Sequence, residues 1–280
     1  MKSNPRYTMC FYISQHLQAE TIARRYGRHT RRVESARRKL AALEREARSA
    51  TDDRTSPYAY RLGEGMYVIP AQADPYALII SSDLQLEVMR WGLTPHSATT
   101  SEKARYDKEH LYKEVPAEQL FTAWPWRKLW QHRRCLLPVT GFFEPHYDEY
   151  GMARPYYIQR IGGIPFCIAA LYDEWRHPTT NEPLRSFATI TVAANPLLRE
   201  IHNGGSHPFR MPLIIPDGYI EQWLAPGTDR QEEVEPYLIP YSAHDLEAWP
   251  VEKSFDSDNP YAPSGIARAE THDPMPALLF

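Results

Sequence analysis

The chain has 280 residues, of which 42% are hydrophobic and 24% charged, a composition typical of a globular protein with a sizeable core. It contains neither an apolar run of the roughly 18 residues that a membrane span needs nor a signal-peptide pattern, which argues against membrane and secreted proteins. The net charge of −3 conceals an asymmetry: residues 21 to 48 carry ten Arg and Lys against three Glu, and residues 215 to 280 carry thirteen Asp and Glu against three Arg and Lys.

The first predicted element is a short strand over residues 9 to 14, followed by helix over residues 15 to 50 with a break near Gly27. In the second helical part a narrow apolar stripe repeats at three- and four-residue steps: Val33, Ala36, Leu40, Leu43 and Ala47. Arginines surround this stripe. We expect the helix to pack on the body of the protein and to offer its basic face to a polyanion. The alternative is an exposed helix whose arginines are merely solvated.

From Tyr58 onward short β-rich runs alternate with turn residues. These runs cover residues 66 to 69, 76 to 80, 84 to 91, 134 to 139, 155 to 159, 165 to 172 and 186 to 193. Residues 101 to 130 are predicted to be helical or irregular, and residues 196 to 201 to form a short helix. Because there is no alternation of strand and helix, the pattern predicts an α+β fold, mostly antiparallel, with the sheet curled into a barrel-like core and a few flanking helices.

The predicted domain organisation is simple. Residues 1 to 8 form an extension that is absent from or removed in the active protein, and residues 9 to 245 form one domain that includes the basic helical segment 18 to 50. Residues 246 to 280 are rich in proline and acidic residues and lack periodicity, which predicts a wrapping or partly disordered tail. Three cysteines without a CxxC pair indicate neither a disulfide framework nor a zinc site, so we expect a reducing, cytoplasmic setting and no metal or cofactor.

Cys10 directly follows Met9, so a chain that starts at this methionine would carry cysteine as its first residue once the methionine is trimmed. An N-terminal cysteine holds an amine and a thiol on adjacent carbons, with ordinary pKa values near ~8 and ~8.5. The amine can form a Schiff base with an aldehyde, and the thiol can then close a thiazolidine ring. This chemistry requires Met9 to be the true start, or cleavage before Cys10. The alternative is an ordinary cysteine in a buried strand.

Four segments in this order resemble those of one family. They are Met9-Cys10, the run from Trp91 to Pro95 (WGLTP), the run from Arg134 to Glu144 (RCLLPVTGFFE), and Ile201-His202 followed by Arg210-Met-Pro. Together they resemble the SRAP family, the SOS response-associated peptidase-like proteins that process abasic sites in DNA, from about Cys10 to Ile215. The resemblance implies a monomeric DNA-damage protein without membrane association. It implies that Cys10 forms a covalent thiazolidine with the ring-opened sugar of an abasic site in single-stranded DNA.

The same resemblance implies further site residues. Glu144 is similar to the catalytic glutamate and His202 to the catalytic histidine, and both can move protons during sugar ring opening and Schiff-base formation. Seven residues separate His202 from Arg210, including a second histidine, His207. Ile201-His202-Asn203 is the better match to the family pattern.

A second group of residues is expected to hold the DNA strand. Arg105 and Arg210 can each fork two hydrogen bonds to a phosphate. Trp91 resembles the aromatic that supports or stacks on nucleotides, with plain core as its alternative. Lys103 stands where the family shows asparagine in Asn-Ala-Arg, and Pro145 stands where it shows tryptophan. Both departures predict a divergent member whose rate or reversibility is altered.

Two other functions remain open from the sequence. A cysteine or N-terminal-nucleophile peptidase would use Cys10 with His202, although no third group that orients the histidine can be recognised. A catalytically degraded binder of single-stranded DNA would keep Arg105, Arg210 and the basic helix but form no adduct, and Lys103 favours it. Autoproteolytic exposure of Cys10 would explain the extra N-terminal residues, and a misplaced start codon is the simpler explanation.

Overall fold

The computed structural model describes residues 12–49, 62–205, 207–227, 230–252 and 259–270. Its strands are β1 (Tyr12–Gln15), β2 (Met66–Pro70), β3 (Tyr76–Ile80), β4 (Leu86–Trp91), β5 (Glu114–Pro116), β6 (Arg134–Val139), β7 (Gly141–Tyr147), β8 (Ala153–Arg160), β9 (Phe166–Arg176), β10 (Pro183–Ala193), β11 (Arg210–Pro212), β12 (Ile214–Ile215) and β13 (Leu246–Pro250). Its α-helices are α1 (Ala19–Arg25), α2 (Arg31–Ser49), α3 (Thr100–Lys108), α4 (Pro196–Ile201), α5 (Ile220–Leu224) and α6 (Gln231–Val234).

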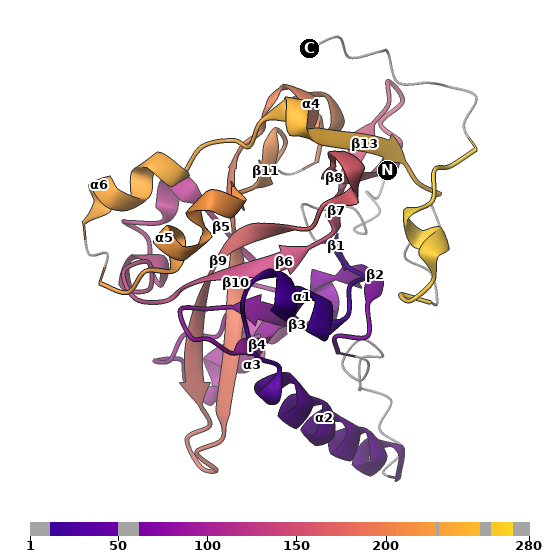
Figure 1. Cartoon of the computed structure of the whole chain (residues 1–280). Coiled ribbons are helices and arrows are strands. Elements are labelled where there is room, and N and C mark those ends of the chain that lie inside the picture. The colour runs from indigo at the N-terminus through magenta and orange to yellow at the C-terminus, as the bar shows by residue number, and fades with distance from the viewer. Residues whose placement is uncertain (1–11, 50–61, 206, 228–229, 253–258, 271–280) are drawn as a thin grey trace.

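Five strands close into a barrel in the order β10-β4-β3-β6-β9, and pairing of β9 with β10 completes the ring. Strands β5, β11 and β12 extend this sheet at its margins, and a second sheet has the order β13-β8-β7-β1-β2. Among the described strands, all pairings are antiparallel except those of β10 with β4 and with β5. The predicted α+β class, with its mostly antiparallel, barrel-like core, is therefore confirmed (Figure 1).

The burial of β6 and β7 explains their place in the fold. Every residue of β6 is buried, as expected for a strand that lies between β3 and β9 inside the barrel. In β7 the side chains alternate between two apolar clusters, so that Phe142 packs in the main core and Phe143 packs with Tyr157 and Val68. Glu144 shares its face of β7 with Phe142 because the period of a strand is two residues. The sequence thereby directs a carboxylate into the interior.

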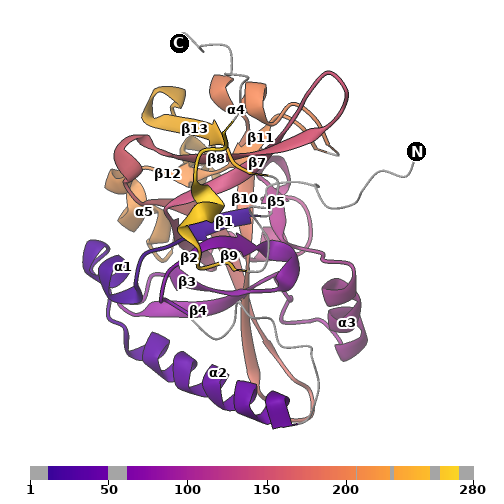
Figure 2. The same ribbon diagram turned by 90° about the vertical axis from the view of Figure 1, so that its right-hand side faces the viewer.

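The predicted break of the N-terminal helix is confirmed at Gly27, whose φ of +62° places it in the left-handed region that ends α1. Helix α2 packs on β4 through its apolar stripe, where Val33 and Leu40 are buried. Its Arg31 and Arg38 are exposed, whereas Arg32 pairs with Asp83. Helix α2 lies at one end of the molecule, and α4 and β13 lie at the other (Figures 1 and 2).

Residues 246–250, the first part of the segment predicted to be a wrapping or partly disordered tail, are a strand in the structure. These residues form β13, which pairs with β8 from Leu246↔Arg160 to Pro250↔Tyr156. Further on, the Trp249 indole N–H donates to the Ile266 carbonyl at 2.8 Å. Proline and acidic residues suggested a tail, but an edge strand tolerates proline because its outer side needs no ladder hydrogen bonds. Among the described helices, none combines the length and the apolar character that crossing a bilayer requires.

Gly141 offers a test of the packing that supports β7. A Cβ built at this position would lie 2.3 Å from the ring of Tyr157, which is fully buried. We expect Gly141→Ala to lower the free energy of unfolding by about 1–3 kcal/mol, because the ring has no room to move. Chemical denaturation would measure this loss. Gly218→Ala, whose Cβ would meet nothing within 4 Å, is the matched control, and equal stability of the two variants would contradict the packing described here.

Candidate functional site

Strand β7 and helix α4 bring together the two predicted catalytic side chains, Glu144 and His202. Oε2 of Glu144 lies 3.5 Å from Nδ1 of His202, and both side chains are almost fully buried. Asn195 caps α4 by accepting from the Leu198 N–H at 2.9 Å, and His202 is the residue that ends the helix. A short helix anchored at both ends therefore presents His202 to the carboxylate of β7.

The hydrogen bonding of His202 indicates which ring nitrogen carries the proton. Nδ1 lies 3.0 Å from the carbonyl oxygen of Arg210, and a carbonyl only accepts. Nδ1 therefore carries the proton in the neutral ring, which leaves the lone pair of Nε2 available to take a proton from a reacting group. The Glu144 carboxylate beside Nδ1 stabilises the imidazolium that would then form.

The chain after His202 is tied to β7 by Asn203. The Asn203 side chain accepts from the Tyr147 N–H at 2.8 Å and donates to the Tyr147 carbonyl at 2.9 Å. Gly204 follows directly, and a Cβ there would lie 2.6 Å from the Tyr147 ring. These contacts hold His202 against Glu144, which favours His202 over the exposed His207 as the histidine of the site. The sequence identified Asn203 only as part of a motif and missed this function.

Arg210 lies beside this pair with its guanidinium already engaged. It makes two hydrogen bonds to Glu118, at 2.7 and 2.9 Å, and a third to the Thr191 carbonyl at 2.8 Å. The bond from Arg210 holds the pKa of Glu118 below its ordinary range. To grip a phosphate, Arg210 would have to give up Glu118. The sequence missed Glu118, because no motif marks it.

A second acidic residue that the sequence missed is Glu114 of β5. Val115 next to it points into the core, so Glu114 points to the opposite face, and Glu114 is opposite Thr189 of β10. Burial raises the pKa of Glu114, and the nearby charges of Arg210 and His202 oppose this rise. The site therefore contains three carboxyl groups, from Glu144, Glu118 and Glu114, around His202 and Arg210.

Cys10 lies outside the described residues, and the structure begins two residues later at Tyr12. Strand β1 is paired with β7 so that Tyr12 is opposite Phe143, and Ile13 is opposite Phe142. The start of β1 is thus fixed next to the residue that precedes Glu144.

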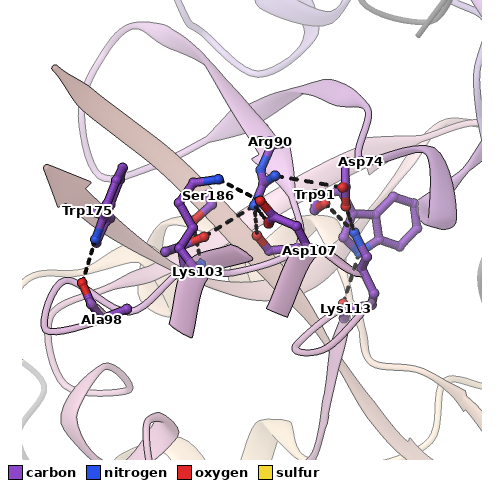
Figure 3. A network of polar contacts seen from close by, with 11 residues as sticks. Asp74, Arg90, Trp91, Ala98, Lys103, Asp107, Lys113, Trp175 and Ser186 are labelled. Atoms are coloured by element: carbon purple, nitrogen blue, oxygen red, sulfur yellow. Dashed lines mark hydrogen bonds and ion pairs between the residues drawn. The ribbon is translucent and has the colours of Figure 1, made fainter. Parts of the chain in front are cut away.

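Trp91 belongs to the core. Its side chain is 1% exposed, its ring stacks on Phe187 with centroids 5.7 Å apart, and its indole N–H donates to the Lys113 carbonyl at 2.9 Å. Lys113 is itself buried and pairs with Asp74 (Figure 3). The structure therefore favours the core alternative for Trp91, which supports the site from within and has no face open to a nucleotide.

Lys103 and Arg105 lie on α3, apart from the Glu144–His202 pair. The Lys103 ammonium donates to Asp107 at 2.6 Å and lies 5.7 Å from the centre of the Trp175 ring (Figure 3). Arg105 is exposed, over the ring of Tyr106. No contact of either residue reaches Glu144 or His202 within the described part of the chain. An exposed position on α3 is suited to contact between Arg105 and a DNA phosphate. The same helix does not bring Lys103 next to Glu144 or His202.

The two described cysteines are inert. Cys135 and Cys167 are free and fully buried, and burial raises the pKa of both thiols, that of Cys167 to about 12. Across the described ranges, no cluster of three or more His, Cys, Asp and Glu side chains is placed to hold a metal ion.

This chain is similar to known proteins in both sequence and structure. The profile of the SOS response associated peptidase (SRAP) family matches residues 9–257. The abasic site processing protein YoqW of Bacillus subtilis (strain 168) is 30% identical over 210 residues, covering 73% of this chain and 88% of that protein. The abasic site processing protein HMCES of Xenopus tropicalis is 28% identical over 165 residues, covering 51% of this chain and 46% of that protein. A crystal structure of a Bacteroides thetaiotaomicron protein has a TM-score of 0.79 at 27% identity, covering 93% of this chain and 100% of that one.

Proposed function

The chain belongs to the SOS response associated peptidase (SRAP) family, and from this premise we propose that it acts on abasic sites in DNA by forming a covalent thiazolidine with them through Cys10. Relatives named abasic site processing proteins support the role in abasic-site handling. The observation that carries the mechanism is the buried Glu144–His202 pair beside the start of β1. We propose that the protein is monomeric and cytoplasmic and that it shields abasic sites in single-stranded DNA.

Covalent connectivity supports Cys10 as the nucleophile. Two residues of chain span at most about 7 Å, and Tyr12 is held opposite Phe143. The amine and thiol of an N-terminal Cys10 are therefore within chain reach of Glu144 and His202. A side-chain thiol elsewhere would give only a reversible hemithioacetal, and Cys135 and Cys167 are buried.

The two catalytic side chains divide the proton transfers. Nε2 of His202 takes the proton of the anomeric hydroxyl as the bond from the anomeric carbon to the ring oxygen breaks. The resulting imidazolium, which the Glu144 carboxylate stabilises, returns the proton to the ring oxygen. The N-terminal amine then attacks the exposed aldehyde, water leaves, and the thiol adds to the Schiff base. General acid–base assistance of this kind is typically worth ~10²–10⁴-fold.

Exposed basic side chains are suited to holding the flanking strand. Arg105 on α3 and Arg31 and Arg38 on α2 are exposed, and such contacts to phosphates do not read sequence. Helix α2 lies far from α4 in Figure 1, so it would bind DNA remote from the lesion. Affinity should fall steeply with salt concentration, because each phosphate contact releases counterions.

The deciding experiment compares chains that begin at Met9 and at Met1. Each is incubated with a single-stranded oligonucleotide that carries one abasic site and is then run on a denaturing gel. We expect a shifted band from the Met9 chain, whose methionine is removed. The fraction of the Met1 chain that gives a band should not exceed the fraction that has lost residues 1 to 9, which intact mass spectrometry measures. A band from Met1 chain that keeps all its residues would contradict the terminal-cysteine mechanism.

A self-cleaving peptidase activity is the second candidate, and one observation favours it. The Glu144 carboxylate beside His202 is the orienting third group of a Cys–His–acid arrangement. In this reaction the Cys10 thiol would attack the carbonyl of Met9, and the Met9–Cys10 peptide bond would break to free the Cys10 amine. Water would then hydrolyse the thioester and release the first nine residues. Time-resolved intact mass of the Met1 chain without DNA tests it, and a mass that never changes would contradict it.

A further inference from the structure

We propose that Glu114 is a further catalytic residue of this site, the acid that protonates the oxygen leaving as water when the Schiff base forms. This inference rests on the proposed function. It concerns a carboxyl group of β5 that none of the sequence motifs includes.

The placement of Glu114 is the first support. Strand β5 pairs in parallel with β10 through Glu114↔Thr189 and Thr191↔Pro116. Thr191 is also the residue whose carbonyl and hydroxyl accept from Arg210, so β5 and Arg210 meet on the same part of β10. The ionisable groups that face Glu114 are Arg210 of β11 and His202 at the end of α4.

The bonding of Glu114 is the second support. Within the described part of the chain its carboxyl group makes no hydrogen bond or ion pair. The Glu118 carboxylate, in contrast, accepts hydrogen bonds from both terminal nitrogens of Arg210. A half-buried carboxyl group without a bound cation keeps its proton more readily than an ordinary glutamate. Glu114 is therefore equipped to donate a proton, and Glu118 is not.

The contrast with Glu144 assigns separate roles to the two carboxyl groups. Glu144 is 1% exposed and lies against His202, so it serves the imidazolium and has no direct supply of protons from water. Glu114 is half-buried, so solvent can return its proton after each transfer. Pairs of titratable groups in different environments commonly divide acid and base functions in this way.

The step balances without any oxidant or cofactor. The Cys10 amine forms a bond to the aldehyde carbon, and the carbonyl oxygen becomes a hydroxyl. Glu114 gives its proton to this hydroxyl, the carbon–oxygen bond breaks, water leaves, and the nitrogen lone pair forms the C=N bond. The thiol sulfur then bonds to the same carbon, and the nitrogen keeps its remaining proton. The thiol proton passes to the Glu114 carboxylate, so the thiazolidine is neutral and the acid is restored.

The test compares wild type, Glu114→Gln, Glu114→Asp and the control Glu149→Gln, which alters an exposed glutamate between β7 and β8. Cross-linking rates to the abasic oligonucleotide are measured from pH 4 to pH 9, a range that brackets the ordinary and raised values of a glutamate. We expect Glu114→Gln to slow the reaction by about 10²-fold at the wild-type optimum. The wild-type rate should fall as pH rises through the pKa of Glu114, because the acid is then lost. This fall should vanish in Glu114→Gln and persist in Glu114→Asp and Glu149→Gln.

A second measurement needs no DNA. Carbon-13 NMR of the glutamate carboxyl groups should show one that titrates above the ordinary range in wild type and is missing in Glu114→Gln. A wild-type chain that forms no cross-link overturns the proposed function and this inference with it. A wild-type cross-link whose rate and pH profile are unchanged in Glu114→Gln overturns the inference alone.

Discussion

Replacing Cys10 with serine is expected to abolish the stable cross-link to abasic DNA while binding to the strand remains. The terminal amine survives in Cys10→Ser, so a Schiff base still forms and can be captured by borohydride. Without the thiol, no thiazolidine closes and the Schiff base hydrolyses. The band on a denaturing gel should fall below detection without reductant and return when reductant is present. Gel shift under native conditions measures the binding that persists.

Cys135→Ser and Cys167→Ser are the matched controls, because both thiols are fully buried and free. We expect both controls to cross-link like wild type wherever they fold. A stable band that persists in Cys10→Ser would point to another amine. Lys103→Ala would then identify or eliminate Lys103, whose ammonium is bound to Asp107 in the structure.

The second large effect is expected for Glu144→Gln. This substitution keeps the shape of the side chain but removes the charge that faces Nδ1 of His202. The imidazolium loses its partner, so we expect the rate of cross-link formation to fall by about 10²–10⁴-fold, with strand binding unchanged. Single-turnover kinetics on the abasic oligonucleotide measure the rate.

Glu200→Gln is the matched control for that substitution, because Glu200 is an exposed residue of the same helix that precedes His202. The double variant Glu144→Gln, His202→Gln should be little slower than the slower single variant, since the two side chains act as one unit. Independent, additive losses in this cycle would show that the two residues act in separate steps.

Much of this arrangement could be predicted from local sequence. The apolar run from Cys135 to Val139 predicts a buried strand, and the proline that follows Asn195 predicts the start of a short helix. Glu144 and His202 were identified because each sits in a recognisable motif. Their proximity depends on the packing of α4 against β7, which no local pattern encodes.

The residues that escaped prediction are those that reach the site through distant pairing. Glu114 and Glu118 lie in a region that the sequence describes only as helical or irregular, because β5 has three residues and owes its strand conformation to β10. Lys103 illustrates the converse. Its neighbours in sequence resemble a motif, yet α3 holds it beside Asp107 and Trp175. The strand conformation of β13 likewise depends on its pairing with β8, and its proline is tolerated because β13 lies at an edge of the sheet.

The pairing of β1 with β7 has a consequence for how the protein is made. When Cys10 is the first residue, as the proposed function requires, a nascent polypeptide leaves the ribosome with its aminothiol first, long before His202 and Arg210 have been translated. Until those residues emerge and fold against β7, the terminus is an unassisted reagent. Its reactivity toward stray cellular aldehydes would then be close to that of free cysteine, and maturation would confine the reaction to sugars delivered by a DNA strand.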